Sequence, residues 1–302
     1  MKTLMVLPGG GAAGAIQAGM ILGYVDAYGW PMSIIGTSVG AMNGAMAATK
    51  SQELIRRVWL DISGPRSVYE PRFLTDFISK ITFFSRSSIY SFSPLKKMIE
   101  KKLDLKQLVE SDVDFWVCYW NANEDRSVIM NKKNPNIIDG IIASAGIPIA
   151  FPEVIIDGEY CFDGGVKDGI PTKFAFKKDA NGLPLLGFVP DRVVILSPVR
   201  VDKSYRINGK FDKITKIAPR VIDGLTSESI YNDMELTLLK NRLPEYKSVE
   251  LVISQPYRTN IDTLEFDPNK IAEAMLIGKD SLKHNTYIYN ESNGFIGEPL
   301  RF

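Results

Sequence analysis

Residues 34–44 read IIGTSVGAMNG, and this stretch decides how the chain is interpreted. Two isoleucines, typical of a buried strand, run into the glycine-rich turn GTSVG at 36–40, and a run of small residues suited to a helix follows. A serine between glycines at a strand–turn–helix junction is typical of a nucleophile elbow, which holds the hydroxyl at the top of a sharp turn. The N-terminus of the following helix also favours a developing negative charge. We therefore predict that Ser38 is a nucleophile rather than a structural serine.

A second glycine-rich turn, LPGGGAAGA, lies at 7–15, again between a predicted strand and a predicted helix. Gly9, Gly11 and Gly14 have the spacing of a dinucleotide-binding turn. That function also needs an acidic residue about 20 positions later, where this chain has none. A phosphate-binding P-loop is excluded because no Gly-Lys-Ser/Thr follows. Two interpretations remain, a tight turn that packs a helix against a strand and an oxyanion hole.

The oxyanion-hole interpretation depends on where the two turns would lie. The carboxyl ends of parallel strands meet at one edge of a sheet, so both turns would lie at that edge. Backbone N–H groups of Gly9, Gly10 and Gly11 would then point toward Ser38, where negative charge develops during attack on a carbonyl. Glycine suits these positions because a side chain would block the approach of an acyl group.

The predicted elements alternate between strands and helices, which indicates an α/β fold with a mostly parallel central sheet flanked by helices. We expect strands at residues 3–7, 33–35, 114–121, 127–131, 193–197 and 249–254, and helices at residues 12–28, 39–49, 52–62, 137–144, 214–239 and 268–284. Because there is no internal repeat and no low-complexity linker, the simplest organisation is one domain covering residues 1–302, with a helical insertion near residues 64–110.

Residues 72–86 of this insertion read RFLTDFISKITFFSR and place apolar side chains at helical spacing. An apolar face with Arg72, Lys80 and Arg86 around it would suit an anionic membrane surface, as a mobile lid or a lipid-contacting helix. A helix packed on the core would show the same spacing. Both interpretations remain open at the level of the sequence.

The composition is that of an ordinary globular protein, with 45% hydrophobic and 24% charged residues. The 36 Lys and Arg nearly balance the 35 Asp and Glu, so nothing favours nucleic acid as a partner. No stretch approaches the roughly 20 apolar residues of a membrane span, and the apolar stretch at 3–7 is too short for a signal-peptide core. We expect a cytoplasmic protein, with peripheral attachment to membranes as an alternative. The oligomeric state is left open.

The cysteines and carboxylates give little sign of cross-links or bound ions. Cys118 and Cys161 are too few for a disulfide framework, which favours a reduced compartment while leaving one bridge open. The carboxylates show no metal-ligand spacing. We therefore expect neither a metal nor another cofactor.

The base that would activate the serine is not obvious. The only histidine, His284, ends the predicted helix 268–284. A Ser-His-Asp triad would need it in the site, but a histidine at a helix C-terminus is more often exposed. The other candidates are Asp157, Asp163 and Asp168, each of which precedes a glycine. Each would also suit an ordinary Asp-Gly turn, and spacing alone does not choose among them.

Together these motifs resemble the patatin-like phospholipase family. Four motifs occur in that family's order: the glycine-rich loop at 9–14, the elbow at 36–40, the stretch IIASAGIPIAFPEV at 141–154, and Asp-Gly-Gly at 163–165. The resemblance covers roughly residues 3–171, and no family signature is recognisable after about residue 200.

The resemblance implies a lipid acyl hydrolase that cleaves acyl esters through a Ser-Asp dyad without histidine. Asp163 would take the proton from Ser38, an acyl-enzyme would form, and the substrate would be a lipid or a membrane surface. The glycines that support the three turns would be Gly14, Gly36, Gly40, Gly164 and Gly165. The alternatives are a catalytically weak lipid-binding or regulatory effector with the same fold, and a conventional Ser-His esterase.

One departure from the family's pattern concerns Ala13. Members of the family commonly carry Arg or Lys in this loop. In this chain the oxyanion hole would therefore rest on backbone donors without a nearby cation.

Overall fold

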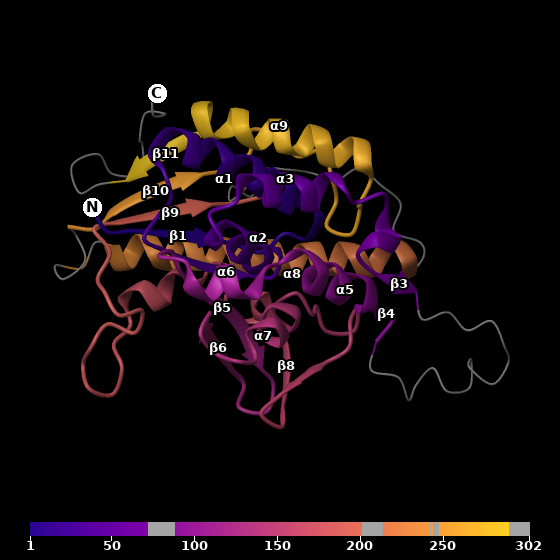
Figure 1. Cartoon of the computed structure of the whole chain (residues 1–302), viewed down its shortest axis with the longest axis horizontal. Helices are drawn as coiled ribbons and strands as arrows, with labels where there is room; N and C mark the ends of the chain where they lie inside the picture. The colour runs from indigo at the N-terminus through magenta and orange to yellow at the C-terminus, as the bar shows by residue number, and fades with distance from the viewer. Residues whose placement is uncertain (72–87, 201–213, 242, 244–247, 290–302) are drawn as a thin grey trace, which may run out of the picture.

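The computed structural model describes residues 1–71, 88–200, 214–241, 243 and 248–289 (Figure 1). The segment 72–86, for which the sequence offers a lid or a packed helix, lies outside these residues.

One sheet collects strands from both ends of the described chain (Figure 1). Its strand order is β11-β10-β9-β1-β2-β5-β8-β7, and β6 also pairs with β5. The neighbours from β10 to β5 are parallel, whereas β6, β7, β8 and β11 pair in antiparallel fashion. The prediction of a mostly parallel central sheet is confirmed. The strands are β1 (Thr3–Leu7), β2 (Ser33–Thr37), β5 (Asp114–Asn121), β6 (Arg126–Asn131), β7 (Val154–Ile156), β8 (Glu159–Asp163), β9 (Arg192–Leu196), β10 (Glu250–Ser254) and β11 (Thr286–Tyr289).

The central strands are buried along their whole length because both faces of the sheet are covered. Every residue of β1 and of β2 is buried. β2 runs two residues beyond the predicted strand and ends at Thr37, directly before Ser38. The sequence predicts no strand at β11, because its four residues form an antiparallel edge and are too few for a periodic pattern.

Helices cover both faces of the sheet. Most of them pack into one core with alternate strand residues such as Leu7, Ile34 and Phe115. On the other face, α8 and the 3-10 helix η5 (Pro171–Phe176) pack into a second core with Leu4 and Cys118. The helices are α1 (Gly14–Tyr28), α2 (Val39–Ala48), α3 (Gln52–Leu60), α5 (Ser93–Lys102), α6 (Leu105–Glu110), α7 (Ile137–Ser144), α8 (Ile214–Asn241) and α9 (Pro268–His284).

The described part of the predicted insertion at 64–110 is largely helical, as expected. It contains a 3-10 turn (Pro65–Ser67) followed later by α5 and α6. The sequence does not predict the short antiparallel pairing between β3 (Glu70–Pro71) and β4 (Tyr90–Ser91), because two residues on each side carry no alternating pattern.

The side chain before α9 explains why this helix matches its predicted bounds. Asp267 accepts hydrogen bonds from the N–H groups of Asn269 and Lys270. Pro268 occupies the first helical position, where no N–H partner is needed. The capping residue and the polar last turn are close in the chain to the ends of α9, so the sequence alone predicts where this helix begins and ends.

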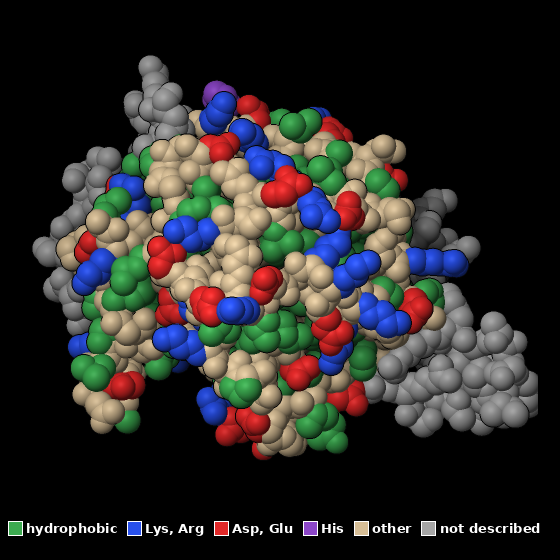
Figure 2. All heavy atoms as spheres, viewed as in Figure 1, with side chains coloured by type: hydrophobic (Ala, Val, Ile, Leu, Met, Phe, Trp, Pro, Cys, Tyr) green, Lys and Arg blue, Asp and Glu red, His purple; other side chains and the backbone are tan. Residues whose placement is uncertain are grey.

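Positively and negatively charged side chains are mixed on the surface of the protein. On the face shown in Figure 2, Lys and Arg side chains are interspersed with Asp and Glu over most of the visible elements. This agrees with the formal net charge of +1.

α1 and α9 lie side by side above the sheet, and glycines allow their backbones to approach closely (Figure 1). A Cβ atom at Gly19 would lie 2.0 Å from the carbonyl oxygen of Met275, and one at Gly278 would lie 1.8 Å from that of Ile16. Real Cβ atoms do not approach backbone so closely, so the two helices need glycine at both positions. This contact fixes the C-terminal helix against the part of the chain that carries the glycine-rich loop.

We expect Gly278→Ala to destabilise the protein because the added methyl group would force α1 and α9 apart. Overpacking of this kind costs about 1–3 kcal/mol. The matched control is Gly224→Ala in α8, where a Cβ would meet nothing within 4 Å, and where alanine should raise the free energy of unfolding by up to about 1 kcal/mol. Urea unfolding of both variants measures the difference, and equal effects would contradict the proposed contact.

Candidate active site

The register of β5 brings the ends of two other strands together. Thr37, the last residue of β2, pairs with Cys118. Asp163, the last residue of β8, pairs with the next residue of β5, Tyr119. β2 runs parallel to β5 and β8 antiparallel to it, so the two strands approach each other end to end. Ser38, which follows Thr37, is therefore placed beside Asp163.

Ser38 has a strained backbone. Its φ of 57° and ψ of −130° lie in a region that residues with a side chain rarely adopt. The Ser38 N–H donates to Oγ of Ser144 at 2.8 Å, and the Ser144 hydroxyl donates to the carbonyl oxygen of Cys118 at 2.6 Å. Ser144 thus ties the strained residue to β5. Ser144 lies within the motif at 141–154, but the motif alone does not indicate this role.

The two glycines of the elbow are needed for close packing rather than for unusual dihedral angles. A Cβ at Gly36 would lie 2.2 Å from the carbonyl oxygen of Gly40. A Cβ at Gly40 would lie 2.0 Å from the carbonyl oxygen of Leu7. The turn therefore presses against the end of β1, where the glycine-rich loop begins.

Asp163 is buried beside Ser38. The Gly165 N–H donates to Oδ1 of Asp163 at 2.7 Å. The Asp163 N–H donates to the carbonyl oxygen of Gly146 at 2.9 Å. Asp163 is 5% exposed and Ser38 is 8% exposed. Burial away from water raises the pKa of the Asp163 carboxyl to about 7, although the Ser38 side chain and the Gly165 N–H both lower it.

The other two Asp-Gly candidates lie in different surroundings. Asp157 forms the hairpin turn between β7 and β8 with Gly158, both at positive φ, which is the ordinary turn that the sequence also allows. Asp168 is 2% exposed and pairs with Lys173 at 2.5 Å. It also binds the Ser127 hydroxyl. Among the described residues, neither carboxylate forms a hydrogen bond with Ser38.

The segment after Asp163 holds the three glycine-rich turns together. The Thr37 hydroxyl donates to the carbonyl oxygen of Asp168 at 3.1 Å. The Gly9 N–H donates to the carbonyl oxygen of Gly169 at 3.4 Å. The sequence does not predict these links, because they join backbone groups from distant parts of the chain.

α8 supports the same segment from the far side. Its Ser229 hydroxyl oxygen accepts from the Gly169 N–H at 3.1 Å, and its Asp233 carboxylate accepts from the Ile170 N–H at 2.9 Å. Burial raises the pKa of Asp233 to about 7, as it does for Asp163. A helix that carries no recognisable family motif therefore holds the loop that follows Asp163.

The glycine-rich loop lies against the serine. A Cβ at Gly9 would lie 3.1 Å from Cβ of Ser38. Gly10 and Gly11 both have positive φ, and a Cβ on either would collide with Pro198 or Thr263. Within the described residues, neither the Gly10 nor the Gly11 N–H donates a hydrogen bond, whereas that of Gly9 is directed to Gly169. Two of the three predicted donors are therefore free.

Two further glycines named by the sequence analysis also mark close contacts. A Cβ at Gly14 would lie 2.3 Å from Cγ2 of Val39, directly after the serine. A Cβ at Gly164 would lie 2.6 Å from the carbonyl oxygen of Cys118. Ala13 is also buried in this loop.

His284 lies away from this cluster at the end of α9. Its side chain is 71% exposed, and its ring lies 3.6 Å from the Asp280 carboxylate one turn earlier. Both cysteines are free and buried. Burial raises the pKa of the Cys161 thiol to about 11, so this thiol is an unreactive neighbour of the site.

An apolar cavity of about 50 Å³ adjoins Ser38. α2, α3 and α5 contribute part of its wall, and loop residues, including those around Phe151 and Phe266, form the rest. A water molecule occupies about 30 Å³ in the liquid, so the cavity is narrow. Three methionines, Met42, Met46 and Met98, line it, and methionine adapts its shape more easily than other apolar residues.

The described residues contain neither a group of three potential metal ligands nor a helix with the length and hydropathy to span a membrane.

Comparison with known proteins identifies the family. The model of the patatin-like phospholipases matches residues 5–176, which is more than half of the chain. The chain therefore belongs to the patatin-like phospholipase family, as its motifs indicate. The match begins in β1 and ends with η5, so it contains the glycine-rich loop, Ser38 and Asp163. Membership supports lipid acyl hydrolase activity in general.

Two similar proteins differ considerably from this chain. It is 24% identical over 199 residues to the uncharacterized protein YjjU of Escherichia coli strain K12, which covers 64% of this chain and 53% of YjjU. This chain thus spans about half the length of that relative. Among solved structures it is similar to VipD from Legionella pneumophila, with a TM-score of 0.46, 15% identity, and coverage of 96% of this chain and 68% of VipD. At these identities neither likeness assigns an activity.

We expect Asp163→Asn to weaken the dependence of stability on pH. The ordinary pKa of 3.8 is raised to about 7, so between about pH 4 and 7 the folded protein keeps a proton that the unfolded chain releases. The free energy of unfolding should therefore fall as pH rises through this range. Asparagine removes this contribution, and urea unfolding of the variant at pH 8 should show greater stability than the wild type. Because Asp233 adds a parallel contribution, the dependence should shrink rather than vanish.

The contrasting variant is Asp168→Asn. It leaves the Lys173 ammonium without its buried partner, and we expect a loss of about 2 kcal/mol at neutral pH. A stabilised Asp168→Asn, or an Asp163→Asn with unchanged pH dependence, would contradict the assigned environments.

Proposed function

We propose that this protein is a lipid acyl hydrolase that cleaves acyl esters through a Ser38–Asp163 dyad and an acyl-enzyme intermediate. The observation that carries the proposal is the strand register that places the buried Asp163 carboxyl beside a serine with a strained backbone. A serine hydroxyl is a weak nucleophile unless a base takes its proton. A carboxyl with a pKa near 7 is a far better base at neutral pH than an ordinary aspartate.

The first half of the reaction forms the acyl-enzyme. Oγ of Ser38 attacks the ester carbonyl carbon while its proton passes to the Asp163 carboxylate. The tetrahedral intermediate then collapses, and the protonated Asp163 gives its proton to the departing alcohol oxygen. The ester bond to the alcohol breaks as the acyl group becomes attached to the serine.

The second half releases the acid. Asp163 accepts a proton from a water molecule, which attacks the acyl carbon, and returns that proton to Oγ of Ser38 as the ester bond to the serine breaks. Asp163 thus acts as base and acid in both halves, which a group that titrates near neutrality can do.

Charge on the carbonyl oxygen would be stabilised by the backbone. The Gly10 and Gly11 N–H groups are the proposed donors, because they have no partner among the described residues. Gly9 forms the wall of the hole through its contact with Ser38. The N-terminus of α2, which begins directly after Ser38, adds a partial positive charge.

The apolar cavity beside Ser38 is the proposed site of the acyl chain. Its wall is built almost entirely from aliphatic, aromatic and thioether side chains, which favours a hydrocarbon chain over a polar acyl group. Because the cavity measures only about 50 Å³, the methionines along it must move to admit a long chain. The proposed substrate is accordingly an acyl ester of a lipid, at a membrane surface or extracted from it.

An active-site probe and a chromogenic ester test the nucleophile and the base. A fluorophosphonate should label the wild type and leave Ser38→Ala unlabelled. Asp163→Asn should lower the turnover of p-nitrophenyl acyl esters by about a thousandfold or more, because the two residues act as a unit. The matched control is Asp157→Asn, which should keep its activity within about twofold because asparagine also tolerates the turn at positive φ. Full labelling of Ser38→Ala would overturn the assignment, and lipid mass spectrometry of treated extracts would identify the substrate.

Substitution of the only histidine, His284, distinguishes the proposed dyad from a conventional Ser-His-Asp triad. We expect His284→Ala to keep kcat/KM within about threefold, as an ordinary surface substitution would. The rate should rise as pH rises through about 7, since Asp163 must lose its proton to act as a base. An ordinary histidine has a pKa of about 6.5, so the position of the acid limb alone does not distinguish a histidine base from Asp163. The decisive result is that this acid limb persists in His284→Ala. A folded variant with activity lowered a thousandfold would favour a triad.

A further inference from the structure

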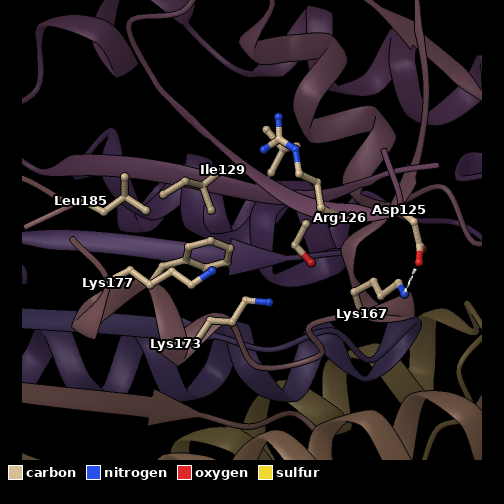
Figure 3. Close-up of a pocket in the computed structure, with 10 residues that line it drawn as sticks. Asp125, Arg126, Ile129, Lys167, Lys173, Lys177 and Leu185 are labelled. Carbon is tan, nitrogen blue, oxygen red and sulfur yellow. Dashed lines mark hydrogen bonds and ion pairs between the residues drawn. The ribbon is translucent and has the colours of Figure 1, made fainter. Parts of the chain in front are cut away.

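A second cavity, of about 500 Å³, lies on the other face of the sheet (Figure 3). Its wall includes Phe174, Ile129 and Leu185, which belong to or pack against the core that contains Leu4 and Cys118. The cavity at Ser38 is lined from the opposite core. The proposed catalytic mechanism uses none of the residues that line the larger cavity.

Basic side chains outnumber acidic ones around this cavity. Arg126, Lys167, Lys173 and Lys177 line it, with Asp125 as the single carboxylate in the lining. In Figure 3 the Lys173 and Lys177 side chains run close together, while Lys167 lies on the other side, next to Asp125. Cations of three separate segments therefore surround one hollow in a protein of nearly zero net charge.

Lys173 and Lys177 form the centre of the cluster. They lie one helical turn apart at η5, and their ammonium nitrogens are 5.3 and 5.2 Å from the centre of the Phe174 ring. An aromatic face attracts cations, so the ring holds both of them in place. Two like charges held over one ring repel each other, and this repulsion would be relieved by an anion between them.

The cluster retains positive charge that the protein itself does not neutralise. Among the described residues, Lys177 makes no ion pair. Lys167 pairs with Asp125 at 2.9 Å, and both side chains are largely exposed, so this pair is weak and easily exchanged. Arg126 uses its Nε to bind Glu124, which leaves its terminal nitrogens available.

The electrostatics of Lys177 agree with a site that lacks its counter-charge. Burial lowers the pKa of the Lys177 ammonium, and the neighbouring Lys173 and Lys240 lower it further, while Asp168 opposes them. Lys173 differs because the buried Asp168 neutralises it on one side. A bound anion would favour the charged form of Lys177.

We propose that this cavity binds a phosphate monoester, with Lys173 and Lys177 on the phosphate and Phe174, Ile129 and Leu185 against the group that it carries. A phosphate monoester has close to two negative charges and three acceptor oxygens, which several separate cations can share. The cavity volume is in the range of about 300–1,000 Å³ typical of small-molecule sites. The apolar wall gives room for a body attached to the phosphate, which a site for a bare ion would not need.

This binding is independent of the proposed acyl hydrolysis, because the two cavities lie on opposite faces of the sheet. It can therefore be measured in Ser38→Ala protein, where failure of the hydrolase proposal has no effect. The lysines are nevertheless close to the catalytic segment in the chain. Lys167 follows the Asp-Gly-Gly motif by two residues, and Lys173 binds Asp168.

Calorimetric titration with inorganic phosphate and with glycerol 3-phosphate, at low ionic strength, tests the site. We expect a dissociation constant below about 1 mM for at least one of them. Lys177→Gln should weaken binding about tenfold, whereas Lys177→Arg should retain it. The matched control is Lys106→Gln, which removes the same charge from a side chain that is 81% exposed on α6. No binding by the wild type, or equal weakening by Lys177→Gln and Lys106→Gln, would overturn the proposal.

Vesicles distinguish a lipid head group from a soluble ligand. Phosphatidate vesicles present a phosphate monoester, and phosphatidylglycerol vesicles present a diester of single charge. Selective, Lys177-dependent sedimentation with phosphatidate would assign the site to a lipid head group, and calorimetric binding without sedimentation would assign it to a soluble phosphate.

A chemical readout keeps the test decisive if Lys177→Gln fails to fold. Phosphate should protect Lys177 of the wild-type protein from an amine-acylating reagent, as quantified by peptide mass spectrometry, and leave Lys106 unprotected. Equal modification of Lys177 with and without phosphate would count against the site.

Discussion

The pairing of Thr37 and Asp163 with successive residues of β5 is the constraint on which the candidate active site depends. β2 and β8 pair with successive stretches along one edge of β5, while β6 occupies the other edge, so β2 must end where β8 begins. The residue after β2 then has to leave the sheet sharply. Ser38 does so at a positive φ, and the last residue of β8 supplies the carboxylate beside it. The register of the sheet, rather than any local motif, therefore sets the distance between the proposed nucleophile and the proposed base.

Polar contacts then fix this junction. Ser144 links the N–H of Ser38 to the carbonyl of Cys118, where the ladder between β2 and β5 stops. Buried backbone groups without partners are costly, so a hydroxyl that both donates and accepts is well suited to a place where two strands end. The same burial keeps water from Asp163 and raises its pKa. Burial therefore has two effects here. It requires the backbone groups of the junction to be hydrogen-bonded, and it makes Asp163 a stronger base.

The loop from Asp168 to Ile170 connects the proposed catalytic site to the rest of the molecule. It receives hydrogen bonds from the glycine-rich loop and from Thr37, and α8 holds it from the other side. Asp168 also binds Lys173 at the edge of the basic cavity. The segment that lies beyond the family match is therefore part of the support of the site, since α8 completes the second core and α9 packs on α1.

Local features of this protein follow from the amino-acid sequence alone. Glycine spacing, the serine elbow and the cap of the helix that begins at Pro268 are set by residues that are neighbours in the chain, so the motifs, the α/β class and the family could be predicted. Which distant groups meet depends on the tertiary structure. The choice of Asp163 beside Ser38 depends on the register of β5, and the engagement of Gly9 with Gly169 depends on a loop far along the chain. Likewise, the pairing of Asp168 with Lys173 and the raised pKa of Asp163 arise from burial among distant segments. Propensity and periodicity describe a residue and its chain neighbours, whereas desolvation and long-range hydrogen bonds exist only once the layers have packed.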